Sequence, residues 1–278
     1  MGRKQETERG ARSRTWWDWV RYAALSLAAM GFLAAGLLLY DRGDRFLASA
    51  RQFQLAPPGA DGESPSFQIR GDHYTSRSRI LSVFAQDFRQ SVYLVPLEER
   101  RRALLEIDWV KDATVCRLWP NRLEISIRER TPAAFVQLAP LRGQGPAEVA
   151  LVDEEGVILE LPPKANFKLP VLAGIRRDQS LASRRTRVSA ALSLLSEAGP
   201  VAGQISEIDV SEPENLKVLQ EVGGRVVLLY LGDRNFQTRL RNFLNHFDQI
   251  HQRMPEIITF DLRLDDRITA VKEGSRRG

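Results

Sequence analysis

The sequence has few of the residues from which most enzymes build reactive or metal-binding centres. Its 278 residues include one cysteine, Cys116, and three histidines, His73, His246 and His251. A single cysteine excludes an intrachain disulfide, and these four side chains cannot form a zinc cage unless carboxylates complete it. The missing disulfide does not identify a compartment, because a chain of this length can bury a core without one.

Motifs typical of catalysis are also missing. The chain contains no glycine-rich phosphate loop, G-x-S-x-G elbow, H-E-x-x-H or C-x-x-C. His246 and His251 lie five residues apart on a predicted helix, about 140° around its axis, which is poor geometry for sharing a metal. We therefore predict a protein with no catalytic residue, no metal site and no cofactor.

Two further candidates have structural interpretations. Cys116 lies within a strand pattern, and we interpret it as a small half-buried apolar residue rather than a nucleophile. Asp265 and Asp266 follow the end of a predicted strand, so we interpret them as turn residues rather than an acid/base pair.

Charge of one sign is not concentrated along the chain. Forty basic and thirty-five acidic residues leave a net charge of +5, and bases often alternate with acids, as in Arg128-Glu129-Arg130. A nucleic-acid-binding face needs a basic stripe with interleaved aromatic residues. The scattered pattern indicates a solvated surface and no nucleic-acid partner.

One long uncharged run is present near the N-terminus. Tyr22–Tyr40 holds nineteen residues without a charge, and as a helix it would measure about 28 Å, close to the hydrocarbon thickness of a bilayer. Trp16, Trp17 and Trp19 lie at one end of the run and Tyr40 at the other, where aromatic rings favour the headgroup zone. The run predicts a single transmembrane helix.

The flanks of this run predict its orientation. Residues 1–21 carry six basic side chains and residues 41–55 carry three, so the positive-inside rule keeps the short N-terminus in the cytoplasm. Ala48-Ser49-Ala50 has the composition of a cleavage site, but the apolar run is longer than a normal signal core and charged residues separate it from that triplet. We expect an uncleaved anchor with residues 41–278 outside the cytoplasm.

Beyond the anchor, hydrophobic periodicity predicts an α+β chain in two parts. A Pro/Gly-rich run at 56–65 indicates a linker. The next segments have the order β-α-α-β-β, with strands at 67–69, 112–119 and 122–128 and helices at 80–88 and 97–106. In the last strand Leu123, Ile125 and Ile127 alternate with polar residues, which predicts one buried face.

The second part predicts a mixed β-sheet with helices. Its expected elements are a hairpin at 149–161 with a turn at 153–156, a helix at 180–198, strands at 205–210, 215–220 and 225–231, a long helix capped by Asp233, and strands at 257–264 and 267–271. The long helix carries an apolar stripe, which is typical of a helix packed on a sheet.

Short motifs in the two parts resemble one family. The first set comprises Trp109-Val110, Ala113, Val115, Arg117, Trp119-Pro120 and LEISIRERTPAAF (123–135). The second comprises LVDEEGVIL (151–159), LPVLAG (169–174), ISEIDVS (205–211), and the stretches 216–247 and 257–271. In order and spacing the chain resembles the FtsQ/DivIB bacterial cell-division proteins, and the β-α-α-β-β part resembles their POTRA domain.

The resemblance implies a division of the chain, a location and a set of partners. The implied segments are a cytoplasmic tail (1–21), a transmembrane helix (22–40), a linker (41–65), a POTRA domain (66–131), a β domain (132–272) and a polar tail (273–278). The implied protein is a non-enzymatic scaffold of the divisome, in the inner membrane at the division septum. An FtsK-like protein would bind the transmembrane helix and POTRA domain, and FtsB-like and FtsL-like coiled-coil proteins would bind the β domain by strand addition.

With the resemblance, the C-terminal sheet edge is the predicted partner site; the residues alone leave open a protected edge whose charges only prevent aggregation. A short last strand has no later element to cover its backbone groups. The candidate residues are Arg263, Leu264, Asp266, Arg267, Ile268, Thr269 and Val271, with the two arginines facing partner carboxylates and Ile268 supplying apolar burial. Two alternatives remain open, a POTRA-type chaperone of an export or outer-membrane assembly system and a membrane-anchored cell-wall hydrolase.

The anchor prediction can be tested directly. N-terminal peptide sequencing of the membrane-bound protein should find the apolar run retained, because charged residues separate it from the small-residue triplet. A mature N-terminus near Arg51 would show instead that the run is a cleaved signal.

Overall fold

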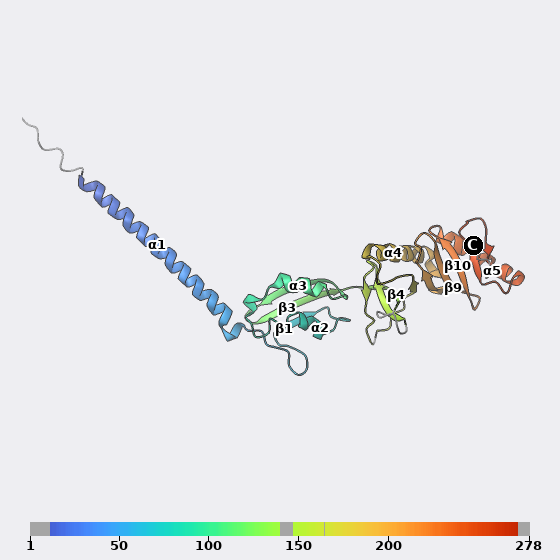
Figure 1. Ribbon diagram of the computed structural model, residues 1–278, viewed down its shortest axis with the longest axis horizontal. Coiled ribbons are helices and arrows are strands. Elements are labelled where there is room, and N and C mark those ends of the chain that lie inside the picture. The colour runs from blue at the N-terminus through green and yellow to red at the C-terminus, as the bar shows by residue number, and fades with distance from the viewer. Residues whose placement is uncertain (1–11, 140–146, 164, 272–278) are drawn as a thin grey trace, which may run out of the picture. The chain divides into compact units, whose positions relative to one another are not determined.

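The computed structural model describes residues 12–139, 147–163 and 165–271 (Figure 1). The chain divides into two compact units. Of the described residues, the first unit comprises 12–70, 78–101 and 114–126, and the second comprises 71–77, 102–113, 127–139, 147–163 and 165–271. Strands β2 (Val110–Leu118) and β3 (Arg122–Glu129) contribute residues to both.

Helix α1 (Arg12–Ser49) contains the uncharged run and extends beyond it at both ends. Its segment Trp19–Ser49 is long and apolar enough to cross a membrane, and the apolar window within it is not buried inside the protein. Past Tyr40 the helix continues for nine residues, where Arg45 binds Asp41 one turn earlier at 2.7 Å. An ion pair at this spacing supports a helix in water. The short 3-10 turn η1 (Arg51–Phe53) follows.

Residues after η1 are held by specific contacts. Leu55 is buried, its N–H donates to the Gln90 carbonyl at 2.9 Å, and its carbonyl accepts from the Arg89 N–H at 2.8 Å. The Ser66 hydroxyl accepts from the Ala56 N–H at 2.9 Å. The ends of the Pro/Gly-rich segment are therefore fixed, and the predicted linker boundaries stay a prediction.

The β-α-α-β-β part contains a three-stranded sheet and two helices in the predicted order, which is thereby confirmed. β1 (Phe67–Arg70) lies parallel to β3, which is central in the order β1-β3-β2. Between β1 and β2 come α2 (Arg77–Val83), the 3-10 turn η2 (Val92–Leu94) and α3 (Leu97–Leu105). The buried face of β3 is also confirmed, because Leu123, Ile125 and Ile127 are buried while their neighbours are not.

The helix predicted over 80–88 is shorter than expected. α2 ends at Val83 and the chain turns through 84–89, with Arg89 at a positive φ of 66°. Phe84 still enters the core from this turn, and the buried Asp87 carboxylate accepts from Arg100 of α3 at 2.6 Å. The helical spacing of apolar residues therefore continues to Phe88, although the helix itself ends at Val83.

The second unit contains a nine-stranded sheet in the order β12-β11-β10-β9-β8-β7-β4-β5-β6. These strands are β4 (Pro132–Leu138), β5 (Glu148–Asp153), β6 (Ile158–Leu159), β7 (Val171–Ala173), β8 (Ile205–Asp209), β9 (Leu216–Val222), β10 (Arg225–Gly232), β11 (Thr259–Asp261) and β12 (Thr269–Ala270). The pairs β4–β7, β7–β8 and β10–β11 are parallel and the others antiparallel, so the predicted mixed sheet is confirmed.

Two helices pack on one face of this sheet and form the main core with it (Figure 1). α4 (Leu181–Ala198) leads into the 3-10 segment η3 (Gly199–Gln204), and α5 (Phe236–Arg253) connects β10 to β11. Phe243 of α5 lies against Phe260 of β11, with ring centroids 5.1 Å apart. The apolar stripe of the long helix is thus core, as its period predicted.

Two details of the C-terminal prediction are wrong. Asp233 does not cap α5; the capping position is Asn235, which makes no side-chain cap, and the first N–H, of Phe236, donates to the Glu197 carboxylate of α4 at 3.2 Å. The strand predicted over 257–264 is limited to Thr259–Asp261, because Arg263 folds back onto Asp261.

The β3 assignment gives a stability prediction. Ile125 is fully buried opposite Ile69. The substitution Ile125→Asp would bury an unpaired charge, which should lower the free energy of unfolding by about 3 kcal/mol or more. Thermal unfolding of the full chain in detergent should show a large loss. The exposed neighbour Ser126→Asp is the matched control, and equal melting of the two variants would contradict the strand phase.

Candidate functional site

β12 is one edge of the nine-stranded sheet. Its register pairs Ala270 with Phe260 and Thr269 with Asp261, and the Val271 N–H donates to the Thr259 carbonyl at 2.9 Å. In an antiparallel pair the hydrogen-bonded positions alternate. Since Val271 bonds inward, Ala270 points its own N–H and C=O away from β11.

The turn before β12 is anchored by a buried arginine. Arg239 of α5 is only 5% exposed, and its Nη1 donates to the Leu231 carbonyl at 2.5 Å. Its Nε donates to Asp265 Oδ1 at 2.7 Å, and Asn235 Nδ2 donates to Asp265 Oδ2 at 2.8 Å. The Arg239 guanidinium and the Asn235 amide hold the pKa of the Asp265 carboxyl below its usual range. Asp265 is therefore the turn residue that the sequence predicted, with a partner in α5 that the sequence did not reveal.

Arg263 is matched inside the chain. Its guanidinium donates to both Asp261 oxygens, at 3.0 and 2.6 Å, and lies 5.8 Å from the centre of the Tyr230 ring. The pair lowers the pKa of Asp261 and raises that of Arg263. An arginine already held by a bidentate carboxylate is less available to a partner's acid, so Arg267, which is exposed, is the better placed of the two predicted arginines.

The other predicted residues divide between surface and core. Leu264 is 56% exposed, and Asp266 and Thr269 are also exposed. Ile268 was expected to offer apolar surface, but it is half-buried and packs on the core, because strand alternation places it on the same face as Ala270. Leu264 supplies the apolar surface instead.

A row of charged and aromatic residues crosses the sheet face opposite the helices, and sequence reasoning missed it. The register aligns Asp209, Lys217, Tyr230, Asp261 and Thr269 across five neighbouring strands. Lys217 Nζ lies 3.5 Å from an Asp209 oxygen and 5.7 Å from the Tyr230 ring centre. The alternation of each strand was visible in the sequence, but which residues face each other depends on the register.

Two protein-family models match the sequence of this chain. The family model described as "POTRA domain, FtsQ-type" matches residues 65–130, and the model described as "Cell division protein FtsQ/DivIB, C-terminal" matches residues 142–263. The chain belongs to the FtsQ/DivIB family. The predicted assignment is thereby confirmed.

Individual FtsQ relatives support the same assignment. The cell division protein FtsQ of Koribacter versatilis is 31% identical over 74% of this chain and 59% of its own length. Those of Myxococcus fulvus and Anaeromyxobacter sp. (strain K) are 26% and 34% identical, over 87% and 63% of this chain and 82% and 60% of their own lengths. The chain thus spans about three fifths of the length of the Koribacter protein.

Cys116, His246 and His251, which we interpreted from the sequence as unreactive, each have surroundings of their own. Cys116 is exposed rather than half-buried, because Ala113 and Val115 take the inward positions of β2. His251 stacks on Phe247 at 5.8 Å, and His246 lies 2.8 Å from the Asn242 carbonyl one turn earlier. Among residues 12–139, 147–163 and 165–271, no group of three or more His, Cys, Asp or Glu side chains is arranged to hold a metal.

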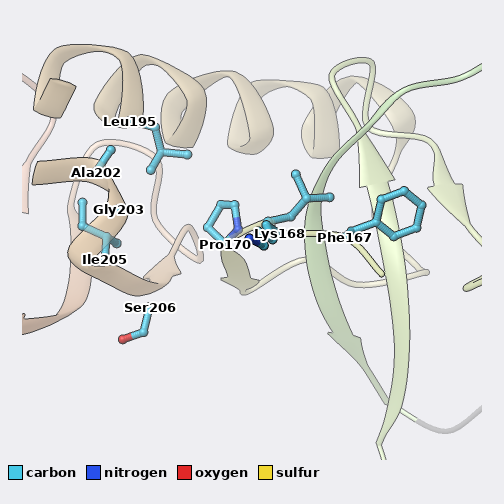
Figure 2. A pocket seen from close by; sticks show the side chains of 9 residues that line it. Phe167, Lys168, Pro170, Leu195, Ala202, Gly203, Ile205 and Ser206 are labelled. Atoms are coloured by element: carbon cyan, nitrogen blue, oxygen red, sulfur yellow. The ribbon is translucent and has the colours of Figure 1, made fainter. Parts of the chain in front are cut away.

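One open pocket lies beside α4, away from the edge strand. Figure 2 shows its lining, which comes from the segment before β7, from α4, and from η3 and the start of β8. The pocket has a volume of about 410 Å³ and is lined by Phe167, Lys168, Leu169, Pro170, Leu195, Ala202, Gly203, Ile205 and Ser206. No carboxylate, histidine or cysteine is among these, so the lining offers no acid/base pair.

The Arg239–Asp265 contact predicts a pH dependence of the edge. A carboxylate whose folded pKa is lowered stabilises the fold above its unfolded pKa of about 3.9, and this contribution is lost as pH falls through the folded pKa. Asp265→Asn should therefore melt below wild type at pH 7, and the difference should shrink towards pH 3.

Asp266→Asn, at the next position of the same turn, is the control and should change melting little at either pH. Thermal unfolding of the full chain in detergent measures both variants. An Asp265→Asn difference that stays constant from pH 7 to pH 3 would contradict the assigned charge interaction.

Proposed function

We propose that the chain is a non-enzymatic scaffold of the cell-division machinery, anchored in the inner membrane at the septum. In this topology α1 spans the bilayer, residues 1–21 are cytoplasmic and residues 41–278 lie on the other side. The uncharged run in α1 and the excess of basic residues before it support this proposal. The family membership supports the cell-division role.

Partner capture at β12 is the proposed mechanism. A partner strand would pair with the outward N–H and C=O of Ala270 and, by the same alternation, of Ile268. The observation that carries the proposal is this short edge strand, whose preceding turn Arg239 holds in place. FtsB-like and FtsL-like coiled-coil proteins are the proposed partners.

Side chains must add to the backbone pairing. Two outward residues offer at most four hydrogen bonds, each contributing a net of about 0.5–1.5 kcal/mol. Leu264 offers apolar area beside the strand, Arg267 offers an unburied positive charge, and Thr269 and Val271 project on the face that carries Tyr230. A partner segment with alternating apolar residues and a nearby carboxylate would complement this edge.

The N-terminal part of the chain is the proposed site of a second partner contact. We propose that the transmembrane helix and the POTRA domain recruit the chain through an FtsK-like division protein. The match of residues 65–130 to the FtsQ-type POTRA family supports this proposal.

The edge mechanism gives a backbone-specific prediction. Ala270→Pro removes an outward N–H while leaving the Val271–Thr259 hydrogen bond available, and proline is tolerated on an edge strand. Losing this donor, and placing the proline ring against the partner strand, should weaken partner binding at least about tenfold.

Ala270→Ser keeps the N–H and is the matched control, expected to bind like wild type. Recovery of two short coiled-coil membrane proteins from membranes, with the full chain as bait, measures the effect at matched expression. If Ala270→Pro retains both partners at wild-type affinity while its melting temperature is unchanged, the docking site lies elsewhere.

A further inference from the structure

Large hydrophobic side chains are exposed at the junction of α1 with the first folded unit. Between residues 41 and 139 five such side chains are exposed, and four of them gather here: Phe46 (56%), Tyr93 (37%), Leu94 (51%) and Trp119 (52%). We call these four residues the collar. A cluster of exposed apolar groups on a folded surface marks an interaction site.

Contacts with the last turns of α1 fix the collar in place. The Tyr93 hydroxyl donates to Asp44 at 3.1 Å, and the neighbouring Ser91 hydroxyl donates to the Leu47 carbonyl at 2.6 Å. Phe53 links the other two rings, with its centroid 5.8 Å from Phe46 and 5.6 Å from Trp119. The collar therefore moves with the end of α1.

Arg117 makes the η2 part of the collar rigid. Its guanidinium donates to three carbonyls in and just after η2, those of Val92 at 2.8 Å, Tyr93 at 3.2 Å and Val95 at 2.6 Å. Carbonyls that are held by one planar guanidinium cannot rearrange independently. Tyr93 and Leu94 are thus presented in one conformation before any contact is made.

The height of the collar matches the membrane surface. Tyr40 ends the uncharged run, and Asp44 and Phe46 follow about 6 and 9 Å further along the helix axis. A headgroup layer extends about 5–8 Å beyond the hydrocarbon on each side. The Phe46 ring and the Tyr93 ring, which is bonded to Asp44, therefore lie at the outer boundary of the headgroups. Trp119 is linked to them through Phe53, and tryptophan and tyrosine both favour this zone.

Charge around the collar suits anionic lipid. Arg42, Arg51 and Arg122 are exposed on α1, η1 and the start of β3. Asp41 is paired with Arg45, and Asp44 keeps its charge while accepting from the Tyr93 hydroxyl, so the three arginines outnumber it. Arginine binds phosphate in a bidentate manner, and basic residues next to a membrane helix are attracted to anionic headgroups.

We propose that the collar and its arginines form a membrane-surface contact that seats the first folded unit on anionic phospholipid headgroups. The inference rests on the proposed membrane anchor. A lipid surface is favoured over a protein partner because the collar continues directly from a helix that can span the bilayer, at the height of the headgroups.

Spin-label depth measurements on the full chain in vesicles test the proposal. Cys116→Ser removes the single cysteine, and Asn121→Cys places a nitroxide two residues after Trp119. Ser126→Cys, about 17 Å further along β3, is the matched exposed control. Collisions with oxygen report lipid and collisions with a nickel chelate report water.

In vesicles of phosphatidylethanolamine with phosphatidylglycerol, the ratio of oxygen to nickel collisions at position 121 should be severalfold higher than at 126. The excess should fall towards the control value in Trp119→Ser and in Leu94→Ser. It should also fall when Arg42, Arg51 and Arg122 are changed together to glutamine.

Equal ratios at 121 and 126 would overturn the proposal. So would shielding of position 121 that arises only when another division protein is added, because the collar would then be a protein-binding surface. A label at Leu33→Cys separates this inference from the anchor itself. If the label at 33 is exposed to lipid and the label at 121 to water, only the proposed collar contact is contradicted. If the label at 33 is exposed to water, the proposed topology is contradicted.

Discussion

An open β-sheet must end in two edge strands, and the second unit is organised around the different ways in which its two edges are finished. At β6, the Trp109 indole donates to the Glu160 carbonyl just after the strand at 2.9 Å, and Trp109 joins the buried Leu159 in one cluster. The Tyr74 ring contacts the rings of Trp109 and Phe167 in tilted arrangements, with centroids 4.9 and 5.4 Å apart. Side chains from elsewhere in the chain thus contact this end of the sheet, whereas the described residues include no later element over β12.

The two faces of the sheet show the same division. One face is covered along the sheet by α4 and α5. On the other face, the β4–β6 end packs against Trp109, while the β8–β12 end carries the row from Asp209 to Thr269. Burial at one end and a matched row of charges at the other let a single sheet act both as a core and as a displayed surface. At the enclosed end, half-buried Arg130 donates to buried Asp153 at 2.7 Å.

Much of the fold could be predicted because it follows from local periodicity. The alternation of Leu123, Ile125 and Ile127 identified a buried strand face, and the stripe on α5 identified its core face. β4 and β7 were not assigned, because β4 begins at a proline and β7 has only three residues, too few for an alternating pattern to be distinctive.

What the sequence could not reveal depends on contacts between distant residues. Glu197, rather than a local side chain, meets the first N–H of α5. Arg239 lies within an apolar stripe, and its partner Asp265 comes twenty-six residues later. For the candidate site, the location of the edge followed from chain order, but the engagement of Arg263 and the inward direction of Ile268 required the strand register.

The unbroken passage of α1 beyond Tyr40 has a consequence for how this protein meets others. A helix is rigid and has a fixed length, whereas a flexible linker with the same number of residues would let the folded part take a wide range of distances from the membrane. In the proposed topology, the Ser91–Leu47 contact sets the distance of the first unit from the bilayer. Encounters with other anchored proteins then become a two-dimensional search within a thin layer, which raises their effective concentration without any gain in intrinsic affinity.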